Sequence, residues 1–163
     1  MEITIRKAAE AEMELLLQWR IRVLREVFSL GADADTNNLI QANEEYYRRH
    51  LADGSHTACF AVKDDGEIIG CGGICYQEEM PSPDNEDGTC GYLMNIYSLP
   101  EYRGHGVGRK IVEYLLTEAK TRGTQKIYLE SSDMAKNLYE EIGFLPMEGY
   151  MKLDRKVSTR AII

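Results

Sequence analysis

The sequence lacks the features that mark membrane, secreted and nucleic-acid-binding proteins. No apolar run is long enough to span a bilayer, and the N-terminal MEITIRKAAE has no basic segment followed by an apolar one. We therefore expect no secretion signal, no membrane partner and a cytoplasmic location. The 19 Lys and Arg residues are outnumbered by 27 Asp and Glu residues, which gives a formal net charge of −8. Nucleic-acid-binding surfaces need a basic field, so we expect no nucleic-acid partner.

Metal-binding patterns are also lacking. None of the four cysteines forms a Cys-x-x-Cys pair, and the three histidines are scattered along the chain. This spacing argues against a zinc site, and we expect no metal. In a reducing compartment the better interpretation is free thiols, mostly buried in strands. These cysteines are Cys59, Cys71, Cys75 and Cys90.

What the chain does contain is the periodicity of a mixed α/β domain. The 163 residues are 44% hydrophobic and 28% charged, without repeats, which is typical of one soluble domain. In the first half, the periodicity predicts a strand at 2–8, helices at 9–28 and 37–51, and two strands within 56–77 joined at Asp65-Gly66. A loop at 78–88 and a strand at 89–99 follow. In the second half, it predicts a helix ending near Gly123, a strand at 126–130, a helix at 133–143 and one or two strands in 144–154. The prediction is therefore a six- to seven-stranded mixed sheet with about four helices, in the order β-α-α-β-β-β-α-β-α-β(β). We expect the domain to span 1–154 and assign no structure to a tail at 155–163, which we expect to be loose.

A glycine-rich loop, YRGHGVGRK at 102–110, separates a predicted strand from a predicted helix. The first N–H groups of a helix have no intrahelical partner, and the helix dipole places partial positive charge there. Glycines at 104, 106 and 108 leave room for an anion, and Arg103 and Arg109 add positive charge. Such a loop favours a phosphate or pyrophosphate ligand over a plain tight turn.

Two familiar phosphate motifs fit this loop poorly. A nucleotide P-loop needs G-x-x-x-x-G-K-[ST], and no Ser or Thr follows Lys110. A dinucleotide fingerprint needs G-x-G-x-x-G, and Arg109 occupies the place of the third glycine. Only 55 residues follow Gly108, which is too few to complete a doubly wound sheet. A dinucleotide-binding domain is therefore a remote alternative.

The segment from Arg103 to Gly108 resembles the (Gln/Arg)-x-x-Gly-x-(Gly/Ala) signature of the GCN5-related N-acetyltransferase (GNAT) family. The segment AKNLYEEIGF at 135–144 resembles a second hallmark of that family, Ala-x-x-Leu-Tyr-x-x-x-Gly-Phe. The spacing of the two segments and the predicted order of elements also match the family. The resemblance covers nearly the whole chain, most specifically residues 94–144, and implies a single GNAT-type domain.

The resemblance implies that acetyl-CoA is the ligand. The pyrophosphate would bind backbone N–H groups of the loop, and the pantetheine arm would pair with the preceding strand, which splays from its neighbour near Ile96 and Tyr128. Ser132 stands where the family often has Asn and can still bond the pantetheine arm. The implied coenzyme-binding residues are Tyr97, Ser98, Leu99, Arg103, Gly104, His105, Gly106, Val107, Gly108, Arg109, Ser132 and Tyr139.

The resemblance also suggests catalytic roles. Tyr139 matches the family's helix tyrosine near the coenzyme sulfur, where a phenol can protonate the departing thiolate. The general base is less evident, because Met94-Asn95 occupies the position at which the family often has a carboxylate. Asn95 would orient a water or the substrate, Glu130 is a candidate base, and proton removal by water is the alternative.

The acceptor site has weaker indications. Acidic residues in the loop at 78–88 would attract a cationic amine, whereas a solvated loop is the simpler interpretation. Arg20, Arg22 and Arg25 on the first helix would meet an anionic group of the acceptor. Trp19 and the pair Tyr46-Tyr47 would line an aromatic pocket, or belong to the core.

Together these features predict an enzyme that transfers an acetyl group from acetyl-CoA to a primary amine by direct attack in a ternary complex. The alternative is an acyl-CoA-binding sensor or interaction module with little activity. The family often forms dimers, so the resemblance also admits a homodimer.

Overall fold

The computed structural model describes residues 1–154, which fall into two compact units, 1–131 and a second unit that begins at Ser132. The first unit contains β1 (Ile3–Lys7), α1 (Met13–Val27), α2 (Asn37–Ala52), β2 (His56–Lys63), β3 (Ile68–Glu78), β4 (Thr89–Ser98), α3 (Val107–Thr121) and β5 (Lys126–Leu129). The second unit contains a 3-10 turn at Asp133–Ala135 and α4 (Lys136–Ile142). This order confirms the predicted α/β arrangement as far as α4.

The strands of the first unit form one sheet in the order β1-β2-β3-β4-β5. The pairs from β1 to β4 are antiparallel. Strand β5 runs parallel to β4, because α3 returns the chain to the end of the sheet at which β4 begins. The predicted hairpin at Asp65-Gly66 joins β2 to β3, and Gly66 has a φ of 89°. The sheet is therefore mixed, as the sequence predicts.

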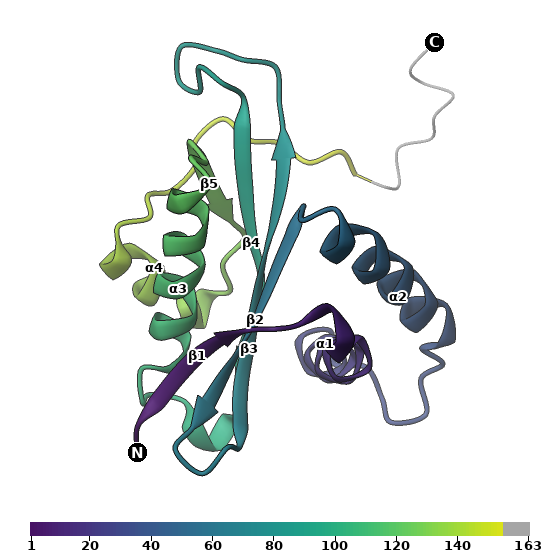
Figure 1. Ribbon diagram of the computed structural model, residues 1–163. Helices are drawn as coiled ribbons and strands as arrows, with labels where there is room; N and C mark the ends of the chain where they lie inside the picture. Colours follow the sequence, from purple (N-terminus) through teal and green to yellow (C-terminus); the bar gives the residue numbers. More distant parts are fainter. Residues whose placement is uncertain (155–163) are drawn as a thin grey trace. The chain divides into compact units, whose positions relative to one another are not determined.

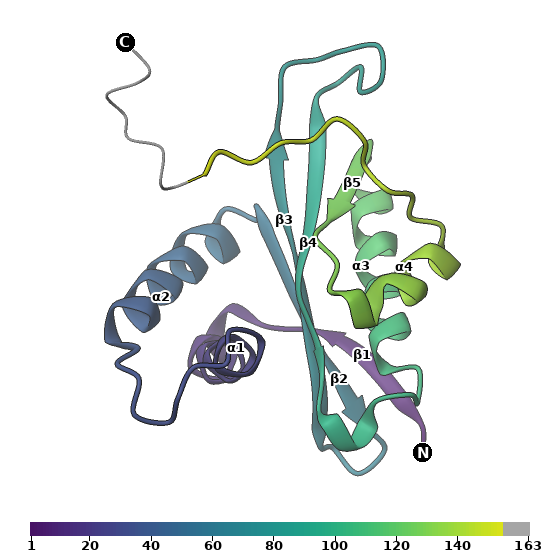
Figure 2. The same ribbon diagram turned by 180° about the vertical axis from the view of Figure 1, so that it is seen from behind.

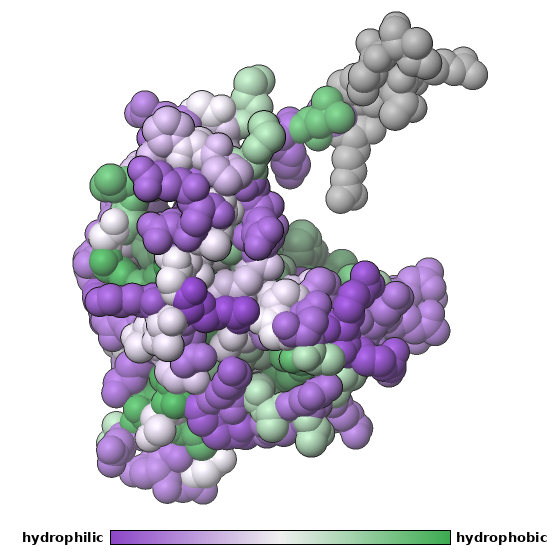
Figure 3. Space-filling model, turned by 45° about the horizontal axis from the view of Figure 1, so that its top comes forward, coloured by the Kyte–Doolittle hydropathy of each residue, from purple (hydrophilic) through white to green (hydrophobic). Residues whose placement is uncertain are grey.

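Helices cover both faces of this sheet (Figures 1 and 2). Helices α1 and α2 lie on one face, and α3 packs on the other through a fully buried stripe that includes Ile111 and Leu115. Gly70 and Gly72 of β3 lie beneath α3. A Cβ atom added to Gly72 would come within 2.3 Å of Ile111, so glycine lets the helix approach the sheet closely. The outer side of α2 is mostly hydrophilic (Figure 3).

Strand β4 contains a β-bulge at Asn95. Cys71 pairs with Tyr97 and Gly73 pairs with Met94, so two residues of β4 lie opposite the single residue Gly72 of β3. Asn95 has a φ of 60°, a left-handed conformation that asparagine tolerates better than most residues. Pairing of β4 with β5 ends at Leu93, immediately before the bulge. The bulge therefore marks the point at which the two parallel strands part.

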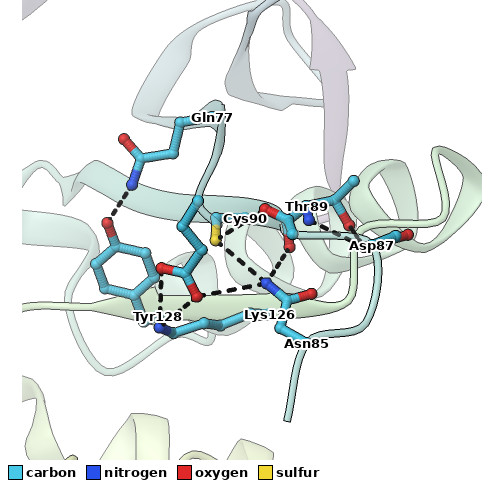
Figure 4. A network of polar contacts seen from close by, with 9 residues as sticks. Gln77, Asn85, Asp87, Thr89, Cys90, Lys126 and Tyr128 are labelled. Atoms are coloured by element: carbon cyan, nitrogen blue, oxygen red, sulfur yellow. Dashed lines mark hydrogen bonds and ion pairs between the residues drawn. The ribbon is translucent and has the colours of Figure 1, made fainter. Parts of the chain in front are cut away.

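The loop between β3 and β4 is folded against β5 rather than fully solvated (Figure 4). Asn85 is 2% exposed, and its side-chain amide donates to the carbonyl oxygen of Thr89 at 3.2 Å. The Lys126 ammonium binds both carboxylate oxygens of Glu79, at 3.0 and 3.2 Å. One of the acidic side chains in this region thus already has a cationic partner.

The sequence prediction was wrong at one place, because residues 144–154 contain no strand. The described residues form a five-stranded sheet, not one of six to seven strands. Apolar side chains in this segment stay exposed, with Leu145 at 84% and Met151 at 97%. Alternating apolar residues form a strand only where a neighbouring strand accepts their backbone hydrogen bonds. The predicted tail, 155–163, lies outside the described residues.

The prediction of free cysteines, mostly buried in strands, is confirmed. All four cysteines are free and lie in strands β2, β3 and β4, and three of them are buried. Within residues 1–154, no helix combines the length and apolar character needed to cross a bilayer.

His56 is a buried polar residue at the start of β2 and is 6% exposed. Its ring lies against Gly73, and its Nδ1 atom is 3.0 Å from the Tyr46 hydroxyl. Burial, together with the smaller effects of the charges of His50 and Arg20, lowers the pKa of His56 to about 4. The folded protein therefore keeps this imidazole neutral at pH values at which an exposed histidine takes up a proton.

We predict that His56 makes the fold sensitive to mild acid. Between the usual histidine pKa of about 6.5 and about 4, the unfolded chain binds a proton that the folded chain does not. The free energy of unfolding should therefore decrease as the pH is lowered from about 6.5 to about 4, by about 3 kcal/mol in total. Urea titrations from pH 4 to 8 should show this slope in the wild type and a shallower one in His56→Asn.

His105→Asn, at an exposed position, is the matched control and should keep the wild-type slope. Equal slopes in His56→Asn and the wild type would show that His56 is not held neutral.

Candidate functional site

The glycine loop leads directly into α3. A 3-10 turn at Pro100–Tyr102 ends at Arg103, and Gly106 is the N-cap residue of α3. Gly104 and Gly106 both have a φ of 79°, and a Cβ atom at either position would meet nothing within 4 Å. The space over both glycines is therefore open, and the N–H groups of the first helical turn have no partner within the helix. This geometry fits an anionic ligand such as a pyrophosphate.

Helix α1 holds this loop through Glu26. The Arg103 guanidinium forms an ion pair with the Glu26 carboxylate, and the Tyr97 hydroxyl donates to the same carboxylate at 2.5 Å. The Arg103 guanidinium also lies 5.7 Å from the centre of the Tyr97 ring. Hydrogen bonds from Tyr97 and Arg103 lower the pKa of Glu26, and burial together with Glu26 raises the pKa of Tyr97 to about 12. The Arg103 side chain thus fixes the loop to α1.

The end of β4 offers a backbone edge beside this loop. Tyr97 and Ser98 pair with β3 on one side, whereas β5 pairs with β4 only as far as Leu93. Among residues 1–154, therefore, no strand lies on the β5 side of Ile96–Ser98. An extended ligand can pair with such an edge as an added strand does. Glu130 follows β5 at the same end of the β4–β5 pair, and its side chain is exposed.

A cavity of about 190 Å³ opens on the face of the sheet that α1 and α2 cover. Its polar lining consists of Arg20, Asn43, Tyr46, His56 and Asn95. Ala42, Tyr47 and Met94 complete the lining. Because Met94 and Asn95 immediately precede Ile96–Ser98, the cavity and the unpaired edge of β4 meet at the bulge.

Two hydrogen-bond systems fix the polar lining. Arg20 donates to the side-chain oxygens of Asn43 at 3.1 Å and Asn95 at 3.0 Å. The Tyr46 hydroxyl lies 2.8 Å from the Cys75 sulfur as well as bonding His56. Burial raises the pKa values of both Tyr46 and Cys75, so these side chains stay neutral at physiological pH. Arg20 is therefore the charged group of the lining.

The structure brings many of the residues singled out in the sequence to the β4–loop–α3 segment. Strand β4 ends with Tyr97 and Ser98, and Leu99 follows it. The loop then holds Arg103, Gly104, His105 and Gly106. The first turn of α3 contains Val107, Gly108 and Arg109. The Arg109 guanidinium lies 3.8 Å from the Glu113 carboxylate, one turn further along α3.

Three other candidate residues lie outside the β4–loop–α3 segment. Glu130 is not part of the cavity lining. Ser132 and Tyr139 belong to the second unit, where Ser132 is the N-cap residue of the 3-10 turn. The Tyr139 ring contacts the Phe144 ring with centroids 5.8 Å apart.

Some of the candidate acceptor residues line the cavity, and the others point elsewhere from their helices. Arg20 lines the cavity, whereas Arg22 stacks on Trp19 and Arg25 bonds the loop after α1. Trp19 belongs to the core, while Tyr46 and Tyr47 line the cavity.

Sequence reasoning missed three residues of the lining: Ala42, Asn43 and His56. Asn43 could have been found, because it precedes Tyr46 by three residues on the same predicted helix and so shares its face. His56 joins the lining because Tyr46 and Tyr47 of α2 contact its ring at the start of β2, and the sequence carries no local signal for this helix–strand contact.

The chain resembles known acetyltransferases along most of its length. Residues 16–144 match the sequence model of the acetyltransferase (GNAT) family. The chain is 31% identical over 129 residues to the uncharacterized N-acetyltransferase YjgM of Escherichia coli (strain K12), covering 76% of this chain and 72% of the relative. It is 29% identical over 101 residues to a glucosamine 6-phosphate N-acetyltransferase of Trypanosoma brucei brucei, covering 62% of this chain and 67% of that protein.

A solved structure agrees with these relatives. The crystal structure of a predicted acetyltransferase from Clostridium acetobutylicum with acetyl-CoA matches the fold with a TM-score of 0.82, at 26% identity, over 94% of this chain and 96% of that one. The family match, the relatives and the bulged, splayed sheet agree with one another. The chain therefore belongs to the GNAT family of acetyltransferases and is an acyltransferase enzyme.

Proposed function

We propose that the protein transfers an acetyl group from acetyl-CoA to a primary amine by direct attack in a ternary complex. The observation that carries this proposal is the junction at Asn95, where an unpaired strand edge and a glycine loop meet a separate cavity. The strand edge and the glycine loop suit an extended, phosphate-bearing donor, and the cavity suits a small acceptor. The Clostridium acetobutylicum neighbour, solved with acetyl-CoA, supports this choice of donor.

The donor would bind along the β4–loop–α3 segment. Its pantetheine arm would pair with Tyr97, Ser98 and Leu99 as an added strand. Its pyrophosphate would accept hydrogen bonds from backbone N–H groups between Gly104 and Arg109, where the open space over the glycines admits the phosphates. Ser132 would bond the pantetheine arm.

The reaction would need no covalent enzyme intermediate. The amine lone pair attacks the thioester carbonyl carbon, the carbon–sulfur bond breaks, and the Tyr139 hydroxyl gives a proton to the departing thiolate. The new amide nitrogen must also lose a proton. No carboxylate lines the cavity and Glu130 lies outside it, so we infer that a water oriented by Asn95 takes this proton.

The names of the relatives leave the acceptor open. One curated relative acts on glucosamine 6-phosphate, and another, from Haemophilus influenzae, on an alanine of ribosomal protein bS18. The latter matches only 54 residues, 32% of this chain, so it says little of the acceptor.

We predict that acetyl-CoA raises the melting temperature of the protein and that Gly106→Ala weakens its binding about tenfold. A side chain at this left-handed position costs roughly 1 kcal/mol and intrudes on the open space over the loop. Isothermal titration of acetyl-CoA measures the affinity. Gly66→Ala is the matched control, because Gly66 has a φ of 89°, also faces open space, and lies in the β2–β3 turn.

Gly66→Ala should lower stability without changing the affinity for acetyl-CoA. Stabilisation by NAD or ATP in place of acetyl-CoA would refute the proposed donor. Binding of acetyl-CoA without thiol release over a wide panel of amines would instead indicate an acyl-CoA sensor.

We further predict that Tyr139→Phe lowers kcat ten- to a hundredfold while acetyl-CoA binds as before. The phenylalanine ring keeps the contact with Phe144 but has no proton to give to the thiolate. Single-turnover thiol release measures the chemical step directly. Tyr114→Phe on α3 removes the same hydroxyl from a different helix and should leave the rate unchanged. A wild-type rate in Tyr139→Phe would remove Tyr139 as the acid.

A further inference from the structure

Arg20 is the basic side chain of the cavity lining, and its hydrogen-bond partners are neutral. It is half-buried on α1, and its guanidinium donates only to the amide oxygens of Asn43 and Asn95. None of the ion pairs formed among residues 1–154 includes Arg20. A cation withdrawn from water without a counter-ion is costly to the fold, so its retention calls for an explanation.

Carboxylates are plentiful in this chain, and several other basic side chains form ion pairs with them. Arg103 is paired with Glu26, Arg6 with Glu12, and Lys126 with Glu79. The chain carries 27 acidic residues against 19 basic ones, yet none of the acidic residues lines the cavity. The cavity is therefore locally positive within an acidic protein.

The two asparagines fix the direction of the Arg20 side chain. Asn43 accepts from Nε and Asn95 accepts from one terminal nitrogen, so hydrogen-bond donors of the guanidinium remain for a further acceptor. Arg20 also contributes to lowering the pKa of the buried His56, which shows that its positive field reaches into the cavity lining. A held guanidinium with donors to spare is suited to a carboxylate or a phosphate.

The size of the cavity limits what can bind there. Its volume of about 190 Å³ is smaller than pockets for drug-sized ligands, which favours a small metabolite over an oligosaccharide. A polycationic amine would be repelled by Arg20 and would find no carboxylate in the lining. A compact amine with one negative group would neutralise Arg20 as it enters.

We propose that the acceptor is a small primary amine that also carries a carboxylate or phosphate group, and that Arg20 binds this anion. This inference rests on the proposed acetyl transfer and specifies its substrate class. Because Arg20 bonds Asn95 directly, the bound anion lies beside the bulge at which β4 leaves β5. The distance from the amine to the anion must therefore be the one that lets the amine reach the donor while Arg20 holds the anion.

The experiment compares amines in matched pairs that differ in the anion. Glucosamine 6-phosphate is paired with glucosamine, and α-amino acids are paired with their neutral carboxamides, so the two pairs separate phosphate from carboxylate. Spermidine serves as the polycation. With acetyl-CoA and the full chain, thiol release should give at least a tenfold higher kcat/KM for the anionic member of at least one pair.

Variants of Arg20 assign the effect to that side chain. Arg20→Gln should lower kcat/KM at least tenfold more for the anionic member than for the neutral member, because only the former loses an ion pair. Arg20→Lys should recover part of the loss, since it keeps the charge but not the fork. Arg22→Gln is the control, because Arg22 lies on the same helix, is exposed and does not line the cavity.

A binding measurement keeps the inference separate from the proposed chemistry. The anionic amine alone should raise the melting temperature of the wild type but not that of Arg20→Gln. A preference for spermidine or the neutral amines, or an equal loss for both members in Arg20→Gln, would overturn the inference and leave the acetyl transfer intact. Failure of acetyl-CoA to bind would instead overturn the proposed function, whatever the outcome for Arg20.

Discussion

The separation of β4 from β5 at Asn95 is the constraint on which the rest of the candidate site depends. Up to Leu93 the two strands are hydrogen-bonded partners, and beyond it an extra residue in β4 turns the strand. Without the bulge, β5 would continue to satisfy the backbone of β4, and no edge would remain for a ligand. The cost is a left-handed asparagine, which the bond from Arg20 to its side chain helps to hold.

Helix α1 connects the two halves of this site. Near its C-terminal end, Glu26 binds Arg103 and Tyr97 and so fixes the glycine loop, while six residues earlier Arg20 reaches the bulge and the cavity. Between them, Val23 is buried and anchors the helix in the core. A shift of α1 would therefore move the glycine loop and the cavity together, so α1 couples the two parts of the proposed site.

The sequence predicts those parts of the molecule that depend on local pattern. The glycine loop, the apolar stripe of α3 and the turn at Asp65-Gly66 are each specified by neighbouring residues, and the structure has all three elements. The bulge and the cavity arise from pairing between distant strands and helices, so the position of His56 could not be inferred. The strands predicted in 144–154 failed for a related reason, since a strand needs a partner as well as alternation.

Amide hydrogen exchange with and without acetyl-CoA tests the central claim most directly, because it reports which backbone N–H groups the ligand covers. We predict that saturating acetyl-CoA slows exchange mainly in Ile96–Ser98 and in Gly104–Arg109, and that NAD does not. Protection of these segments by NAD, or tight binding of acetyl-CoA that leaves both segments unprotected, would contradict the claim that the donor lies along the edge opened by the bulge.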